Sequence, residues 1–103
     1  MVREVAPLEL KLAVERTHGG RASYVQSVPV RETHAGQTVW EGMVGIFDLT
    51  DHPAATRAYA WSSPIDGSED RRFHAVLHIG GIKSPTDAVR AAIVAEARAR
   101  TKA

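Results

Sequence analysis

The sequence has no cysteine, few aromatic side chains (6%) and no excess of charge of either sign. Without cysteine, the chain can form neither a disulfide bond nor a zinc site with thiolate ligands. Its 13 lysines and arginines balance 12 aspartates and glutamates, which gives a formal net charge of +1. Such a balance supplies no overall electric field that would attract nucleic acid.

Long apolar runs are missing as well. The N-terminal segment MVREVAPLELKLAVER alternates apolar and charged residues. It lacks the continuous apolar region of a signal peptide or a membrane span. We therefore expect a cytoplasmic protein without membrane contact. A chain of 103 residues has the size of one domain, and we predict a single α+β domain over residues 1–103.

The first patterned segment, residues 8–16, is compatible with two structures. Apolar residues occupy every second position, at Leu8, Leu10, Leu12 and Val14. Period two is typical of a half-buried strand. Leu8 and Leu12, like Leu10 and Val14, also have the i,i+4 spacing of one helix face. We predict a strand, with a helix as the alternative, and then a hairpin turn at Gly19-Gly20.

Two further segments have strand patterns. In residues 23–32 we expect Tyr24, Val28 and Val30 on one face, and Pro29 indicates an edge strand or a bulge because it cannot donate to a ladder. Residues 38–49 are apolar on both faces, with Val39, Met43, Phe47 and Leu49 opposite Trp40, Val44 and Ile46. That pattern is typical of a central strand covered on both sides.

Residues 57–63 and 71–79 are the remaining predicted strands, joined by a turn at Asp66-Gly67. A helix follows to the end of the chain, with Ser84 as N-cap, Pro85 at the first position and Asp87 in a capping-box arrangement. The predicted fold is an antiparallel β-meander of four to five strands with one C-terminal α-helix packed on one face.

His74 and His78 raise the question of a metal site. On a strand they share one face with Val76, while Phe73, Ala75, Leu77 and Ile79 form an apolar face. At about 3.3 Å per residue, the two imidazoles are roughly 13 Å apart. They cannot readily share one zinc ion, whose nitrogen ligands lie at about 2.0–2.1 Å. We expect neither a metal nor a cofactor.

A small enzyme or ligand-binding protein with a site around His52 and His78 is one alternative function. Asp48 and Asp51 are close to His52 in sequence, but Asp-x-x-Asp-His before a proline is typical of turns and caps. The sequence has no nucleophile elbow, phosphate loop or dinucleotide fingerprint. A cleft in which either histidine is hydrogen-bonded to a carboxylate would favour an enzyme.

Single-stranded nucleic-acid binding through the sheet face is the other alternative. Tyr59 and Trp61 share a strand face, and a stacked base is worth about 1–3 kcal/mol. Large aromatic rings are also the usual material of a core or a self-association face, so we do not favour this function. The candidate ligand-binding residues of both alternatives are Arg57, Tyr59, Trp61, Arg71, Arg72, His74 and His78.

The segments TVWEG and FDL, HPAATRAYAW and SPTDAVRAAI together resemble a family of small uncharacterised bacterial proteins over residues 23–94. The resemblance implies no activity, cofactor or site. The order of strands before one closing helix is also similar to a family of single-strand-binding proteins, but fold alone does not imply function.

One helix can cover only one face of the predicted sheet, whereas residues 38–49 are apolar on both faces. Contiguous exposed apolar patches are rare on monomers. A strongly curled sheet could cover itself; otherwise a second protomer must do so, and we predict a homodimer. The leading functional hypothesis is a non-enzymatic binding or interaction module that acts through protein–protein contacts.

Overall fold

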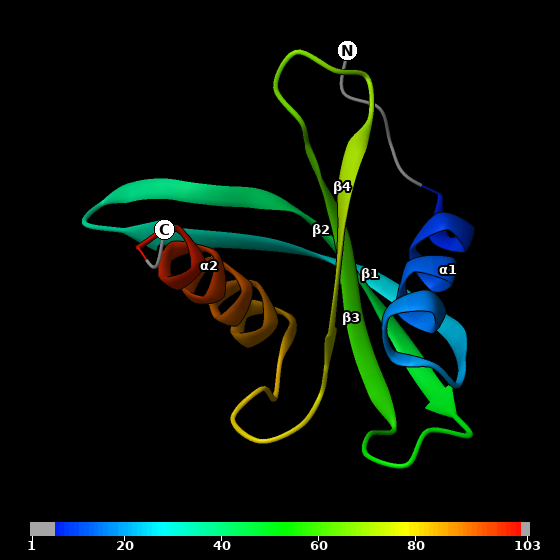
Figure 1. Cartoon of the computed structure of the whole chain (residues 1–103). Coiled ribbons are helices and arrows are strands. Elements are labelled where there is room, and N and C mark those ends of the chain that lie inside the picture. The colour runs from blue at the N-terminus through cyan, green and yellow to red at the C-terminus, as the bar shows by residue number, and fades with distance from the viewer. Residues whose placement is uncertain (1–5, 102–103) are drawn as a thin grey trace.

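The computed structural model describes residues 6–101. The elements follow one another as α1 (Pro7–His18), β1 (Arg21–His34), β2 (Gln37–Thr50), β3 (Arg57–Pro64), β4 (Arg71–Leu77) and α2 (Pro85–Thr101). The strands form one antiparallel sheet in the order β1-β2-β3-β4 (Figure 1). The α+β class and the four-stranded meander are therefore confirmed, but the fold has a second helix besides the predicted C-terminal one.

The prediction of a strand over residues 8–16 is wrong, because this segment belongs to α1. Pro7 lies at the start of the helix, where a missing backbone N–H costs nothing, and Glu9 lies in the first turn beside the positive end of the helix dipole. The rest of the segment consists mainly of strong helix formers, and Val14 is its one β-branched residue. Residue preference, not the period-two pattern, decides the local structure here.

The predicted hairpin turn at Gly19-Gly20 is instead the connection between α1 and β1. The N–H of Gly19 donates to the carbonyl oxygen of Glu15 and closes the last turn of the helix. Both glycines have positive φ, at 80° and 74°, a backbone region that glycine adopts without steric cost. The chain can therefore leave α1 and enter the edge of the sheet within two residues.

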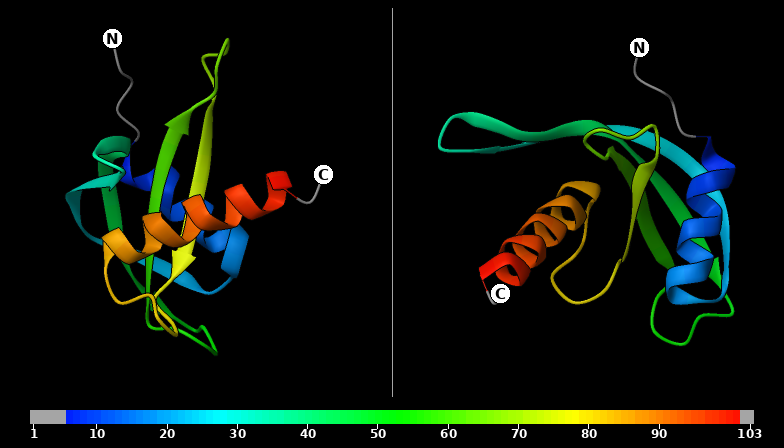
Figure 2. Two further views of the ribbon diagram at one scale, coloured as in Figure 1. Left: turned by 90° about the vertical axis from the view of Figure 1, so that its left-hand side faces the viewer. Right: turned by 45° about the horizontal axis from the view of Figure 1, so that its top comes forward.

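The two helices cover opposite faces of the sheet (Figure 2). Two separate clusters of buried side chains result, because successive strand residues point to opposite faces. The cluster under α1 contains Leu10, Val14, Ala22, Phe47, Leu49, Ala55, Ala58 and Ala60. The cluster under α2 contains Val30, Val44, Ile46, Tyr59, Trp61, Ala88 and Val89.

Strand β1 changes faces at a bulge. Tyr24 pairs with Phe47 and Gln26 pairs with Ile46, so Val25 is an extra residue without a partner on β2. An extra residue reverses which side of the sheet the following side chains occupy. Tyr24 therefore lies on the α1 side, and the expectation that it shares a face with Val28 and Val30 is wrong. The predicted edge position of this strand is confirmed.

Beyond the bulge, β1 and β2 leave the rest of the sheet together. The pairing of β2 with β3 covers only Gly45–Asp48, whereas its pairing with β1 extends to the turn at residues 35–36. We call residues 26–44 the β1–β2 arm; it extends over α2 (Figure 1). An ion pair of 3.1 Å between Arg90 Nε and Glu32 Oε1 joins α2 to this arm.

Two glycines in β2 lie where an added side chain would meet close neighbours. A Cβ atom at Gly45 would lie 2.9 Å from Cε2 of Phe47 and 3.2 Å from Cδ1 of Leu10. A Cβ atom at Gly42 would lie 2.9 Å from the ring of Trp40. The absence of a side chain at Gly45 thus allows α1 to pack directly on the sheet.

The start of α2 agrees with its sequence. Oγ of Ser84 accepts a hydrogen bond of 3.1 Å from the N–H of Asp87, as an N-cap does. The carboxylate of Asp87 accepts one of 3.1 Å from the N–H of Lys83. The bond to Ser84 satisfies one of the backbone donors that the first turn of a helix leaves unpaired, and the bond to Asp87 holds the residue before the N-cap.

Candidate interaction surface

Two of the candidate ligand-binding residues, Tyr59 and Trp61, lie in the core between the sheet and α2. Each has 2% of its surface exposed. Trp61 packs edge-on against Trp40, with ring centroids 6.1 Å apart, and is stacked on the imidazole of His74 at 5.2 Å. The rings are packed against protein and offer no open platform for a stacked base.

The histidines among the candidates bind neighbouring side chains. Nε2 of His74 is 3.0 Å from Oγ of Ser63, and Nδ1 of His78 is 2.6 Å from the hydroxyl of Tyr59. Burial lowers the pKa of His74 and raises the pKa of Tyr59. Both effects favour neutral side chains under α2.

The three candidate arginines also have partners within the chain. Arg57 Nη2 lies 3.3 Å from Asp48 Oδ1, and Arg72 Nη1 lies 3.1 Å from Glu96 Oε1. Arg71 donates to Oγ of Ser62 at 2.7 Å and to the carbonyl oxygen of the same residue at 3.2 Å. The positive track expected for nucleic-acid binding is therefore interrupted by carboxylates and by hydrogen bonds to β3.

His52 stabilises a turn. Its Nδ1 accepts hydrogen bonds from the N–H groups of Ala54 and Ala55, at 3.0 and 3.1 Å. Among the hydrogen bonds of residues 6–101, neither His52 nor His78 has a carboxylate partner. Over the same residues, no three His, Asp or Glu side chains gather as metal ligands would. The arrangement that would favour an enzyme over a binding protein is not present at these histidines.

The sheet face opposite α2 is covered in part by α1. Phe47 and Leu49 are buried beneath this helix, which removes part of the reason for expecting a partner protomer. On the arm the same face is open, and Met43 is 56% exposed. A shallow groove of about 350 Å³ lies there, lined by Pro29, Val30, Arg31, Glu41, Gly42 and Met43.

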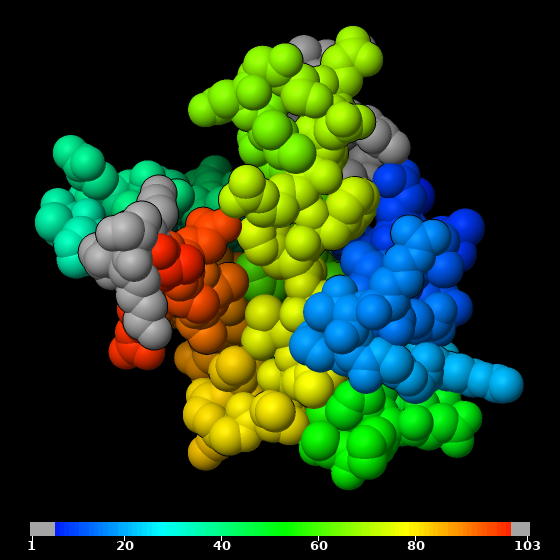
Figure 3. Space-filling view, in the orientation of Figure 1, coloured from blue at the N-terminus to red at the C-terminus, as the bar shows by residue number. Residues whose placement is uncertain are grey.

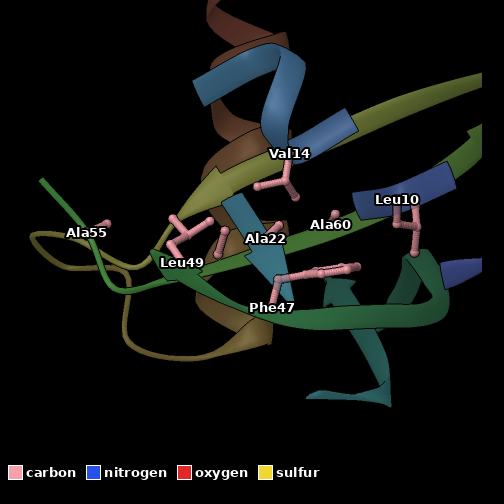
Figure 4. Packing of buried hydrophobic residues seen from close by; sticks show 8 residues of the cluster. Leu10, Val14, Ala22, Phe47, Leu49, Ala55 and Ala60 are labelled. Carbon is pink, nitrogen blue, oxygen red and sulfur yellow. The ribbon is translucent and has the colours of Figure 1, made fainter. Parts of the chain in front are cut away.

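A second apolar surface lies on α1 itself. Leu10 and Val14 are 6% and 0% exposed and point into the core (Figure 4). Leu8 and Leu12 are 62% and 39% exposed. With 3.6 residues per turn, the two pairs lie about 200° apart around the helix axis. We call Leu8 and Leu12 the outer leucine pair; α1 lies at the outside of the molecule (Figure 3).

Charged residues flank the outer leucine pair on both sides. Helical spacing places Lys11 and Glu15 on one flank and Glu9 and Arg16 on the other. Nζ of Lys11 is 2.9 Å from Oε2 of Glu15. The N–H of Ala22 donates to the same carboxylate at 2.9 Å, and these two bonds lower the pKa of Glu15.

The outer leucine pair was not among the residues selected from the sequence. The signal for it was present, since Leu8 and Leu12, like Leu10 and Val14, have i,i+4 spacing. A period-two apolar pattern wound into a helix necessarily places apolar residues on two opposite sides. A strand would place all four apolar residues on one face, so the prediction of a strand indicated no second apolar side.

Comparison with known proteins gives no relative from which a function could be transferred. No family model, curated protein or solved structure matches the chain. None of the helices within residues 6–101 is long and apolar enough to cross a membrane.

Proposed function

We propose that this protein is a small binding module that acts through protein–protein contacts and associates as a homodimer. The observation that carries the proposal is the outer leucine pair on α1. A surface helix of a globular protein ordinarily has one apolar stripe, and a helix that is apolar on more than one side is usually covered there too. The inner side of α1 packs on its own sheet, so its outer side is the part that a partner would cover.

Three further observations support binding over chemistry. The histidines of the alternative site, His52 and His78, engage backbone N–H groups and a tyrosine hydroxyl, which are structural partners. The net charge of +1 imposes little electrostatic repulsion between two copies of the chain. The groove on the arm, with the flexible side chain of Met43 exposed, is of a kind that adapts to protein partners.

The test is the mass of the protein in solution, measured by light scattering over a range of micromolar concentrations. We expect a species of twice the 11.2 kDa chain mass. Introducing charge at the outer leucine pair, as Leu8→Glu with Leu12→Glu, is expected to give the monomer. Val94→Glu is the matched control, because Val94 is an exposed apolar residue of α2, and it should leave the dimer intact. A wild-type protein of 11.2 kDa at every concentration would contradict the proposal.

A further inference from the structure

We infer that α1 pairs in antiparallel orientation with α1 of a second copy, about a two-fold axis that passes the middle of the helix beside Leu12. The inference rests on the proposed homodimer and specifies which surface forms it and how. A two-fold contact must be self-complementary, since each residue pair across it occurs twice. The apolar and charged residues of α1 meet this condition in one register.

The register follows from the bounds of the helix. α1 extends from Pro7 to His18, so its middle falls between Leu12 and Ala13. Full antiparallel overlap places Leu12 level with Ala13 of the second copy, so the two Leu12 residues are about 1.5 Å apart along the axis. Leu8 then lies within one residue of the level of Arg16 of the second copy, whose aliphatic stem can cover a leucine.

Charge complementarity selects this register over its neighbours. Full overlap places Lys11 within one residue of the level of Glu15 of the second copy, on the same flank. On the other flank it places Glu9 level with Arg16. A shift that packs Leu8 against Leu12 of the second copy would instead bring Lys11 near Lys11 and Glu9 near Glu9. Antiparallel helices also oppose their dipoles, whereas parallel ones align them.

The open face of the arm is the competing surface, and it carries one ion pair. Arg31 Nε lies 3.4 Å from Oε2 of Glu41 and donates to Oγ1 of Thr38 at 3.0 Å. Lys11 and Glu15 are likewise paired within α1, but α1 has a further acid and base on its other flank, whereas Arg31 and Glu41 are the charged residues that line the groove on the arm. The arm also extends to the opposite side of the molecule from α1 (Figure 1). A dimer formed through α1 therefore leaves the arm accessible.

The experiment uses single cysteines, because the chain has none of its own. We expect Leu12→Cys to form a disulfide-linked dimer under mild oxidation. We expect Leu8→Cys to form little, although Leu8 is more exposed, because antiparallel overlap separates the two Leu8 positions by about 13 Å along the axis. A disulfide requires Cα atoms within about 7 Å. Val94→Cys on α2 is the control for random collision and should resemble Leu8→Cys.

Each outcome has a distinct consequence. Equal cross-linking of Leu8→Cys and Leu12→Cys would indicate a parallel pair or random collision and overturn the inference. A dimer by light scattering without a Leu12→Cys cross-link would also overturn it, while the proposed homodimer would stand. A wild-type monomer would overturn both.

Charge reversal provides a second test that leaves the leucines in place. Glu9→Arg alone, or Arg16→Glu alone, should weaken dimerisation by roughly tenfold, since each creates like-charge neighbours at two symmetric places. The double variant Glu9→Arg with Arg16→Glu should restore most of the affinity. Circular dichroism confirms that each variant retains its helices. A double variant weaker than both single variants would contradict the antiparallel register.

Discussion

His74 lies where the sheet, α2 and an aromatic ring meet. Its imidazole is stacked on Trp61 with an angle of 14° between the ring planes, and Nε2 contacts Oγ of Ser63. The charged groups that face it are Glu96 from α2 and Arg72 from its own strand. Burial is the largest influence on its pKa and lowers it, so the folded protein favours the neutral ring.

We expect His74 to contribute to a loss of stability in mild acid. Its pKa is lower in the folded than in the unfolded chain, where it is near 6.5, so the unfolded chain takes up the proton first. The stability due to the neutral ring is complete above that pH and falls as the pH drops towards and through the lowered folded-state pKa. Urea unfolding at pH 8 and pH 5 measures this loss.

The comparison requires two variants. His74→Phe keeps an aromatic ring and removes the titration, so its free energy of unfolding should fall less between pH 8 and pH 5 than that of the wild type. His34→Phe is the control, since His34 is exposed at the end of β1, and should behave like the wild type. An identical fall in all three proteins would show that His74 has no part in the acid response.

At the scale of elements, α1 contains leucines in two environments, one buried and one exposed. Leu10 is buried against Gly45 and Phe47, whereas Leu8 is exposed. Leu10→Ala should lower the free energy of unfolding by about 2–5 kcal/mol, because it leaves a cavity under the helix. Leu8→Ala should change it by no more than about 0.5 kcal/mol in the monomer.

Chemical denaturation of both variants at a dilution where the monomer dominates measures the difference. Dilution is necessary because association with a second folded copy would stabilise the wild type and obscure the comparison. Equal losses for the two alanine variants would mean that α1 does not pack on the sheet through Leu10. They would also remove the basis for calling Leu8 an outer residue.

The elements that were predictable from the sequence are those in which local signals agree. The cap formed by Ser84 and Asp87 located α2, and apolar residues on both faces located β2 as an internal strand. In residues 8–16 the period-two pattern disagreed with the helix preference of the residues, and the preference prevailed. The bulge at Val25 has no comparable signal, because a single extra residue in one strand depends on the register with its partner.

At the scale of the whole molecule, burial could not be read from strand faces alone. Tyr59 and Trp61 do share a face, as the sequence predicts, but α2 covers that face. The direction in which a helix crosses a sheet depends on the connection before it and on contacts such as that between Arg90 and Glu32. These contacts join residues far apart in the chain. The apolar surface that a partner would cover is therefore the outer side of α1 and not the sheet face.

The central claim is that the outer side of α1 is the contact between two copies of the chain. Two-dimensional NMR of the ¹⁵N-labelled wild type, recorded over a series of concentrations, tests it without any substitution. The account predicts concentration-dependent amide shifts centred on residues 8–16, with little change at Met43 in the arm or Val94 in α2. Shifts centred on the arm, or spectra that do not change with concentration while the mass remains that of one chain, would contradict it.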